Sequence, residues 1–312
     1  MRDDLKILIM GRTGSGKDYL ARLLTERGLK QLISSTTRPK RTPEENTHVF
    51  MTKEEADAIP EEEKVARTVI NRYEYFATKQ QVLESDIYII DPNGYYMLRH
   101  KMPDTPFLVV YVKADREEAK KHAILRASDQ EREAEIFEER YAAEDEQFTA
   151  FENALMHGDG TVITHLVQND FREHGTLANA ANRILRHRNQ FRGMYHLTEM
   201  AKKNGLVQVS ENGRIKVVTE DGIVEKSDAQ FALVLMTEPE GVGRIVLALM
   251  RQPDVRLVSG YLARMDTDLD CTAESFTGYM AELMEEYPYD ESTVQTHSWM
   301  EKIYNLCIPD VR

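Results

Sequence analysis

The chain has 312 residues, of which 41% are apolar and 30% are charged, and its formal net charge is −13 at pH 7. This length favours about two domains with packed cores, and the acidic balance argues against a broad basic surface, so we expect no nucleic-acid partner. No apolar run reaches membrane-spanning length and the charged N-terminus lacks the core of a signal peptide, so we expect no membrane partner and a cytoplasmic location.

A glycine-rich segment lies near the start of the chain, between an apolar run and a helical pattern. Residues 6–10 (KILIM) predict a buried strand, and residues 19–24 (YLARLL) predict a helix. The segment between them contains GRTGSGK, which fits the spacing G-x-x-x-x-G-K of loops whose backbone N–H groups surround phosphate oxygens. Lys17 would contact the terminal phosphates as a point charge. The residues predicted to bind ATP in this way are Gly11, Thr13, Gly14, Ser15, Gly16 and Lys17.

Asp18 follows the lysine, at a position where such loops usually have a Ser or Thr whose hydroxyl holds Mg²⁺. A carboxylate can hold the metal directly or through water, although without metal it would repel phosphate. The alternative is a helix-capping aspartate after a glycine-rich turn. Because the strand, the loop and the helix occur in the required order, we predict that Asp18 binds ATP–Mg²⁺.

A second candidate phosphate site comes about twenty residues after the loop. Residues 31–34 (QLIS) predict a short strand, which leads into the sequence SSTTRPKR. Its hydroxyls and three cations suit a dianionic phosphate. A solvated basic loop is the alternative, but the nearby glycine-rich loop favours a functional interpretation.

The order of residues in this segment resembles the guanylate kinase family. SSTTRPKR followed by Glu44 and then HVF is similar to that family's S-x-T-T-R-x-x-R-x-x-E…Y-x-F signature, although the segment is about two residues shorter. The resemblance implies that Ser34, Arg38 and Arg41 hold the monophosphate of an acceptor nucleotide. His48 stands at the family's tyrosine position and could still donate a hydrogen bond.

The base-binding part of the resemblance is less complete. Thr78 in YFAT matches the hydroxyl of the family's Y-Y-G-[ST] turn, which touches the base. The family's guanine-reading glutamate falls at Arg67, and an arginine can only donate hydrogen bonds, although Glu74 or another acceptor could take its place. The acceptor is therefore either GMP or dGMP or a nucleotide with a different or modified base.

Three further apolar runs predict strands at residues 87–91, 107–112 and 161–170. The first ends at Asp91, which resembles the second aspartate of the family's D-x-D-x-Q-G and could orient Mg²⁺-bound water or the acceptor; a helix cap is the alternative. The last ends at Asn169, which resembles the family's V-x-N-D motif beside the donor adenine and is therefore predicted to bind ATP.

Residues 115–151 predict one long, highly charged helical region, a pattern that is usually a solvated face. RYAAE from Arg140 loosely resembles the start of the family's R-x-x-x-A-x-x-E helix, with the alanine one place early. In the family this arm is a lid whose arginines close on the transferring phosphoryl group. The resemblance implies that Arg126 and Arg140 do so here, whereas Arg132 has no clear match.

Other patterns predict the remaining elements. Thr52 and Glu55 form a capping-box pattern that predicts a helix over 52–64, and a helix over 177–188 closes a first domain of residues 1–188. The resemblance covers roughly residues 5–187. Residues 186–190 are interpreted as a charged joint.

Residues 189–312 match no family that we can name, and their patterns predict a smaller α+β domain. Dimerisation, partner binding and lid control are all open roles for it. Cys271 and Cys307 lie in this part without metal-binding spacing and are expected to be reduced thiols. The predicted elements are a helix at 194–203, a meander over 206–224, helices at 230–236 and 242–250, a strand at 255–263, and helices at 272–287 and 293–307.

The predicted fold is therefore α/β, with a P-loop parallel sheet flanked by helices, insertions for binding a nucleoside monophosphate and for a lid, and a smaller C-terminal α+β domain. The predicted function is transfer of a phosphoryl group from ATP–Mg²⁺ to a nucleoside or deoxynucleoside monophosphate. The alternatives are a catalytically inactive guanylate-kinase-like interaction module and a P-loop kinase of another phosphorylated metabolite. The C-terminal domain could also support a homo-oligomer.

Overall fold

The computed structural model describes residues 5–40, 42–70, 72–127, 129–157, 163–172, 175–219, 222–237 and 245. The chain divides into two compact units, Met1–Leu185 and Arg186–Arg312. The division falls inside one helix, α7 (Thr176–Lys203), so the predicted joint at residues 186–190 is helical and the predicted helices at 177–188 and 194–203 are one. A run of charged residues is compatible with a helix, and neither glycine nor proline interrupts residues 186–190.

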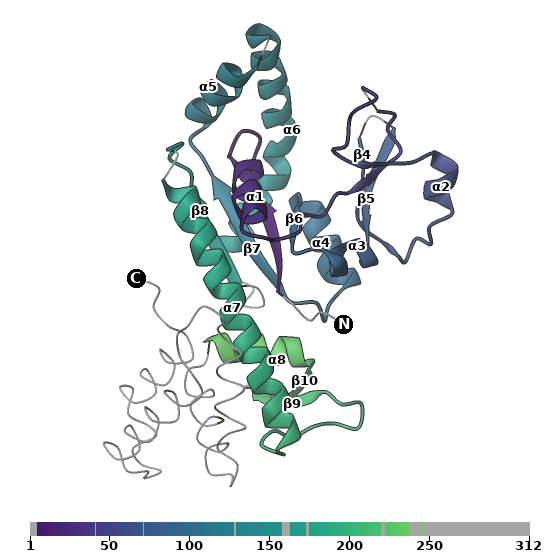
Figure 1. Cartoon of the computed structure of the whole chain (residues 1–312), viewed down its shortest axis with the longest axis vertical. Helices are drawn as coiled ribbons and strands as arrows, with labels where there is room; N and C mark the ends of the chain where they lie inside the picture. The colour runs from purple at the N-terminus through teal and green to yellow at the C-terminus, as the bar shows by residue number, and fades with distance from the viewer. Residues whose placement is uncertain are drawn as a thin grey trace. The chain divides into compact units, whose positions relative to one another are not determined.

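A four-stranded parallel sheet forms the centre of the first unit, in the order β6-β1-β7-β8 (Figure 1). Its strands are β1 (Lys6–Met10), β6 (Ile87–Ile89), β7 (Phe107–Lys113) and β8 (Ile163–Gln168). The registers pair Ile7 with Ile87 and with Leu108. These strands confirm the predicted apolar runs, because a parallel sheet covered on both faces needs continuous apolar residues.

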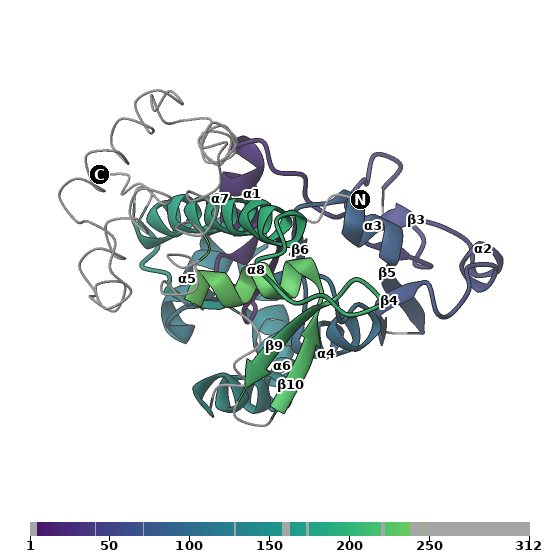
Figure 2. The ribbon, with the colours of Figure 1, turned by 90° about the horizontal axis from the view of Figure 1, so that it is seen from below.

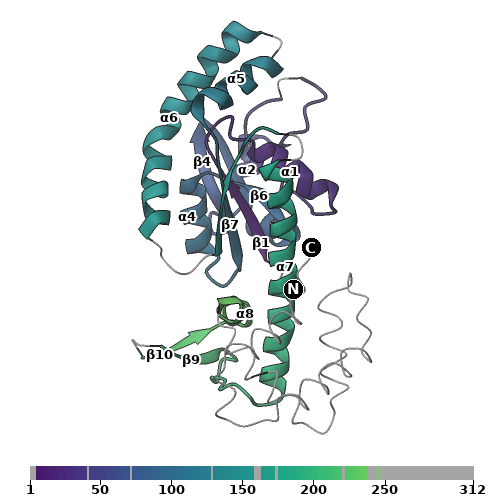
Figure 3. The ribbon, with the colours of Figure 1, turned by 90° about the vertical axis from the view of Figure 1, so that its left-hand side faces the viewer.

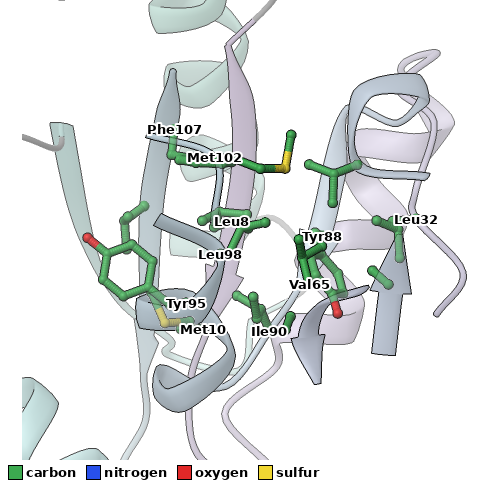
Figure 4. Packing of buried hydrophobic residues seen from close by; sticks show 14 of the residues in the cluster. Leu8, Met10, Leu32, Val65, Tyr88, Ile90, Tyr95, Leu98, Met102 and Phe107 are labelled. Carbon is green, nitrogen blue, oxygen red and sulfur yellow. The ribbon is translucent and has the colours of Figure 1, made fainter. Parts of the chain in front are cut away.

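Helices cover both faces of this sheet (Figure 3). On one face, Leu8, Met10 and Tyr111 join a core with α4 (Pro92–Lys101) and α6 (Gln130–His157), to which α4 contributes Tyr95 and Leu98 (Figure 4). Alternate residues of a strand point to opposite faces, so the other face carries Ile7 and Ile9. Helix α1 (Lys17–Glu26), which buries Leu20 and Leu24, lies on that side.

A second sheet, in the order β3-β2-β5-β4, is inserted between α1 and β6. Its strands are β2 (Ser35–Thr36), β3 (Val49–Phe50), β4 (Lys64–Ile70) and β5 (Tyr73–Thr78), and helix α3 (Lys79–Glu84) follows them. The predicted strand at 31–34 is wrong: Gln31 makes only an isolated bridge to Ile87, and the strand begins at Ser35.

The predicted helix at 52–64 begins correctly but is too long. Thr52 and Glu55 form the capping box, and α2 (Lys53–Asp57) then ends well before residue 64. Pro60 disfavours helical geometry at Ile59, and the β-branched residues of β4 favour a strand. The hairpin of β4 and β5 was therefore missed by the sequence interpretation.

The predicted helical region at 115–151 is two helices, α5 (Arg116–Arg126) and α6. Asp115 caps α5 by accepting hydrogen bonds from the backbone N–H groups of Glu117 and Glu118, at 3.0 and 3.1 Å. Ala127 has an extended backbone with a ψ of 146°, which ends α5. The two helices pack together, and Glu138 of α6 pairs with Lys120 of α5 at 2.7 Å.

The second unit contains the later part of α7, an antiparallel hairpin and helix α8 (Asp228–Thr237) (Figure 2). The hairpin consists of β9 (Ile215–Thr219) and β10 (Gly222–Lys226), and Val209 makes an isolated bridge to Ile215. The predicted meander is therefore two strands and a bridge. Helix α8 confirms the predicted helix at 230–236.

Other predictions for residues 189–312 are not tested by the part of the chain that the structure describes. The predicted elements at 242–250, 255–263, 272–287 and 293–307, together with both cysteines, lie outside the described residues, apart from Ile245, which is helical. Self-association through this unit stays a prediction. Within the described ranges, no helix has the combination of length and apolar character that crossing a membrane requires.

Candidate active site

The glycine loop, residues 11–17, connects β1 to α1 at the carboxyl end of the parallel sheet. Gly16 has a left-handed backbone with a φ of 96°, and α1 starts at the next residue. No side chain caps this helix end. The first backbone N–H groups of an uncapped helix need acceptors, and the helix dipole favours an anion there. The loop therefore has the properties of an anion-binding site.

Glycine is required in this loop by close approaches as well as by backbone geometry. A Cβ added to Gly11 would lie 2.4 Å from the carbonyl oxygen of Val112. One added to Gly16 would lie 2.6 Å from Nδ2 of Asn169, and one added to Gly14, which has a φ of 76°, would lie 2.8 Å from the ring of Phe137. These neighbours come from β7, from the end of β8 and from α6, so three elements that are distant in sequence pack against the loop.

The ammonium group of Lys17 lies over the glycine loop. Its Nζ donates a hydrogen bond of 3.3 Å to the carbonyl oxygen of Arg12, and the side chain is half-buried. This long hydrogen bond holds a positive charge close to the backbone N–H groups of the loop. A ligand phosphate could therefore take the ammonium group as a charge-assisted donor.

A cavity of about 390 Å³ is lined in part by the loop, and it brings together several predicted site residues. Thr13, Gly14, Gly16 and the exposed Asp18 line it from the loop and from the start of α1. The other lining residues are Tyr19, Ala123, Arg126, Ala127, Glu133 and Arg140. Two arginines that are far from the loop in sequence thus share a cavity with it.

Helix α6 also contacts the loop directly through Arg12. The guanidinium donates a 2.8 Å hydrogen bond to Asp145 and a 3.1 Å hydrogen bond to Thr149, and its Nε lies 3.6 Å from Glu152. The rings of Tyr141 and Phe148 flank it at 5.2 and 5.6 Å. Burial alone would lower the pKa of Arg12, but Asp145 and Glu152 outweigh that effect and raise it. Arg12 is therefore a permanently charged anchor for α6.

Glu144 of α6 binds the next residue of the loop. One carboxylate oxygen accepts a 2.7 Å hydrogen bond from the backbone N–H of Thr13, and the other accepts a 2.7 Å hydrogen bond from the Thr13 hydroxyl. A second cavity, of about 160 Å³, lies beside these contacts and is lined by Thr13, Tyr141 and Asp145 among others. A carboxylate thus occupies one backbone donor of the loop.

Asn169 is used by the protein to hold the loop. Its Nδ2 donates a 2.9 Å hydrogen bond to the carbonyl oxygen of Ser15, and its Oδ1 accepts a 2.8 Å hydrogen bond from the backbone N–H of Phe171. The side chain is buried, with 6% of its surface exposed. The prediction that Asn169 reads adenine is not tested by these contacts, but they assign it a positioning role.

Arg38 is paired with a carboxylate in its own segment. Its Nη2 and Nη1 donate to Glu45 at 2.7 and 3.2 Å, and its guanidinium lies 5.2 Å from the centre of the Phe50 ring. The hydrogen bond to Glu45 raises the pKa of Arg38. A phosphate could replace this carboxylate, because both accept two parallel N–H bonds from a guanidinium.

The neighbours of Arg38 were predicted to share its ligand. The Ser34 hydroxyl lies 3.0 Å from Nδ1 of His48, and the His48 ring packs edge-on against Tyr75 and Phe50. Ser34 and His48 are therefore brought together, as the candidate phosphate site requires. Arg41 lies outside the described residues.

Glu74, the candidate base acceptor, is buried with 7% of its surface exposed. Nε and Nη2 of Arg67 lie 3.2 and 3.1 Å from its two oxygens, and Lys53 and Lys64 lie at 3.5 and 3.8 Å. The hydrogen bond from Arg67, together with these cations, lowers the pKa of Glu74. The negative charge of Glu74 is therefore already balanced by cations. Arg67 itself is half-buried.

Thr78 and Asp91 both cap helices. The Thr78 side chain accepts from the backbone N–H of Gln81 in a capping box of α3. Asp91 accepts 2.9 Å hydrogen bonds from the backbone N–H of Gly94 and from Nε2 of Gln147. In the part of the chain that the structure covers, no group of three or more His, Cys, Asp or Glu side chains is arranged to hold a metal ion. Metal binding by Asp18 and Asp91 stays a prediction.

The sequence interpretation missed the residues that bind the loop from α6. Glu144, Asp145 and Glu152 belong to a charged run that was interpreted as a solvated face. Asp145 and Glu152 are seven residues apart, which places them on one face of a helix two turns from each other, and this signal was available. Glu45 was also missed, because the signature indicated Glu44.

Comparisons with known proteins give a distant structural likeness. No protein-family model matches the chain, and no curated protein matches it in sequence. A crystal structure of guanylate kinase from Anaplasma phagocytophilum aligns with a TM-score of 0.36 at 15% sequence identity, over 58% of this chain and 82% of that one.

Proposed function

We propose that the first unit is an ATP-dependent kinase that phosphorylates nucleoside or deoxynucleoside monophosphates. The observation that carries this proposal is the 390 Å³ cavity in which the glycine loop shares its walls with Arg126 and Arg140. Backbone N–H groups and Lys17 suit the phosphates of the donor, and the two arginines suit the charge that develops on a transferring phosphoryl group. Lys17 does not line this cavity itself; its ammonium group binds the carbonyl oxygen of Arg12 in the same loop.

The donor would bind through the loop. Gly11, Gly14 and Gly16 pack against Val112, Phe137 and Asn169, where a Cβ would not fit, and this packing holds the backbone of the loop in place for a phosphate. On binding, Lys17 would exchange the carbonyl oxygen of Arg12 for a phosphate oxygen. Mg²⁺, held by Asp18 together with phosphate oxygens, would supply further neutralisation of the phosphate charge.

The acceptor phosphate would bind at Arg38 with Ser34 and His48, displacing Glu45 from the guanidinium. An oxygen of this phosphate forms the new bond to the terminal phosphorus of ATP, and the bond from that phosphorus to the leaving ADP oxygen breaks. The attacking oxygen is already ionised, so no base of unusual pKa is required. Positioning and charge neutralisation provide the rate enhancement.

The pairing of Glu74 with Arg67 favours an acceptor base other than plain guanine. Guanine offers N–H donors that require an acceptor, whereas Glu74 is buried and already binds Arg67. Arg67 gives its Nε and Nη2 donors to Glu74, and the remaining N–H groups of its guanidinium can also only donate, so a base that presents carbonyl or ring-nitrogen acceptors fits this pair better than one that presents N–H donors. GMP and dGMP turning over fastest would remove this part of the proposal.

An assay of ADP release across ribo- and deoxyribonucleoside monophosphates, including modified pyrimidines, tests the proposal. We expect ATP-dependent turnover with at least one of them, and turnover about 10²- to 10³-fold lower with the Lys17→Ala variant. Binding of ATP–Mg²⁺ without turnover of any nucleotide would instead favour a kinase of another phosphorylated metabolite. No heat on titration with ATP–Mg²⁺ would favour an interaction module without catalysis.

A further inference from the structure

The contact between Glu144 and Thr13 places an anionic group on a donor that the proposed ligand needs. Glu144 lies 131 residues from Thr13 in the sequence, and its carboxylate accepts both the backbone N–H and the hydroxyl of that residue at 2.7 Å. A carboxylate and a phosphate both use oxygen acceptors, and both are favoured near a helix N-terminus. One N–H cannot serve both fully at the same time.

The contact is part of a larger attachment of α6 to the loop. Asp145, the next residue, binds Arg12 at 2.8 Å, and Glu152 lies two turns further along the same helix, 3.6 Å from Arg12. These three carboxylates bring several negative charges beside a loop that we propose to bind a polyanion. Like charges repel, so a polyphosphate bound at the loop would weaken this attachment.

We propose that Glu144 is an internal ligand of the glycine loop, which occupies the Thr13 donors in the nucleotide-free chain and gives them up to a phosphate oxygen. This inference rests on the proposed function, because it requires the loop to bind phosphate. Arg140 lies four residues earlier on the same helix and lines the 390 Å³ cavity. Release of Glu144 therefore removes one attachment of the helix that carries Arg140, while the bonds from Arg12 to Asp145 and Thr149 remain.

The alternative is that Glu144 stays on Thr13 and orients it for the ligand. The two roles predict opposite changes in nucleotide affinity when Glu144 is replaced. A displaced competitor must be removed at a free-energy cost, so its loss strengthens nucleotide binding, whereas loss of a positioning group weakens it.

The test measures the Kd of ATP for the full chain by titration calorimetry, comparing wild type with Glu144→Gln. Glutamine keeps the shape of the side chain and removes its charge. Glu146→Gln is the matched control, because Glu146 is an exposed acid on the same helix. We expect Glu144→Gln to tighten ATP binding about tenfold, as the loss of a charge-assisted hydrogen bond predicts, and Glu146→Gln to change it less than about twofold.

Hydrogen exchange in the absence of nucleotide gives a second readout. We expect the backbone N–H groups of residues 140–151 to exchange about threefold faster in Glu144→Gln than in Glu146→Gln, because α6 loses an attachment to the loop. ATP binding that Glu144→Gln weakens or leaves unchanged would overturn this inference alone. No ATP binding by wild type or by either variant would overturn the proposed function as well.

Discussion

Two cationic sites in the first unit are neutralised by carboxylates, but from very different distances along the chain. The partner of Arg12 in the glycine loop is Asp145, 133 residues away, whereas the partner of Arg38 is Glu45, only seven residues away. A ligand at Arg38 therefore needs only its own segment to rearrange. A ligand at the glycine loop must compete with a 28-residue helix.

This difference in sequence separation predicts that ligand binding has different consequences at the two sites. Exchange of one local carboxylate for a phosphate changes little else, so the Arg38 site should respond mainly to the acceptor. Helix α6 contributes Glu144, Asp145 and Glu152 to the loop contacts and also carries Arg140, so under our proposal a ligand at the loop would affect the helix that holds a second cation. Of the two proposed sites, the glycine loop is therefore the one whose occupancy we expect to affect a distant element.

We expect the largest effect on turnover from a substitution in the glycine loop, the proposed donor site. In Lys17→Ala the point charge over the loop is lost, and we expect turnover to fall by about 10²- to 10³-fold, the range for removal of one preorganised electrostatic donor. Initial rates of ADP release measure it. Lys121→Ala is the control, because Lys121 is an exposed lysine on α5 paired only with Glu118 in the described contacts, and its rate should change less than about twofold. Equal rates for the two variants would contradict the assignment of the loop.

The glycine loop could be predicted from the sequence because its geometry is local. A strand, two glycines and a lysine at fixed spacing are enough to recognise the loop of residues 11–17, although distant elements also pack against it. Its neighbours could not be predicted, because the contact of Glu144 with Thr13 depends on where a distant helix packs. The same limit applies to the strands β4 and β5, whose residues do not alternate cleanly, and to the end of the helix that was predicted over 52–64.

The Arg38 site gives the next largest effect. Arg38→Ala removes a planar pair of donors, and we expect the KM of the acceptor to rise about 10- to 100-fold while the KM of ATP changes little. Glu45→Gln should instead lower the KM of the acceptor a few-fold, because it weakens the internal competitor of the phosphate. Steady-state kinetics with each substrate varied in turn measures both constants. A rise in the KM of ATP equal to that of the acceptor would show that Arg38 does not belong to a separate site.

Alanine substitutions at two glycines test how far the conformation of the loop depends on the elements packed against it. Gly11→Ala would force a Cβ to within 2.4 Å of the carbonyl oxygen of Val112, and we expect it to lower the free energy of unfolding by about 1–3 kcal/mol. Gly28→Ala meets no atom within 4 Å, but Gly28 has a φ of 90°, so backbone strain alone should cost about 1 kcal/mol. Urea unfolding measures both. A larger loss at Gly28 would mean that the sheet relaxes around the loop.

The smallest expected effect concerns pH and belongs to the sheet next to Arg38. Arg67 and the nearby lysines lower the pKa of Glu74 in the folded chain, so as pH falls below about 4.3, the ordinary value for glutamate, the unfolded chain takes up the proton first. The free energy of unfolding contributed by this carboxylate is therefore present at neutral pH and is lost as the pH falls through the lowered pKa. Glu74→Gln should be about 1 kcal/mol less stable than wild type at pH 6, and the gap should narrow toward pH 3. Glu62→Gln, at an exposed position before β4, should show no such change. If the difference in the free energy of unfolding between wild type and Glu74→Gln stays constant with pH, packing of the Glu74 side chain, and not its charge, stabilises this sheet. Pairing of a cation with a carboxylate in the same part of the chain, as seen for Arg38 and Glu45, would then not be what stabilises Glu74 and Arg67.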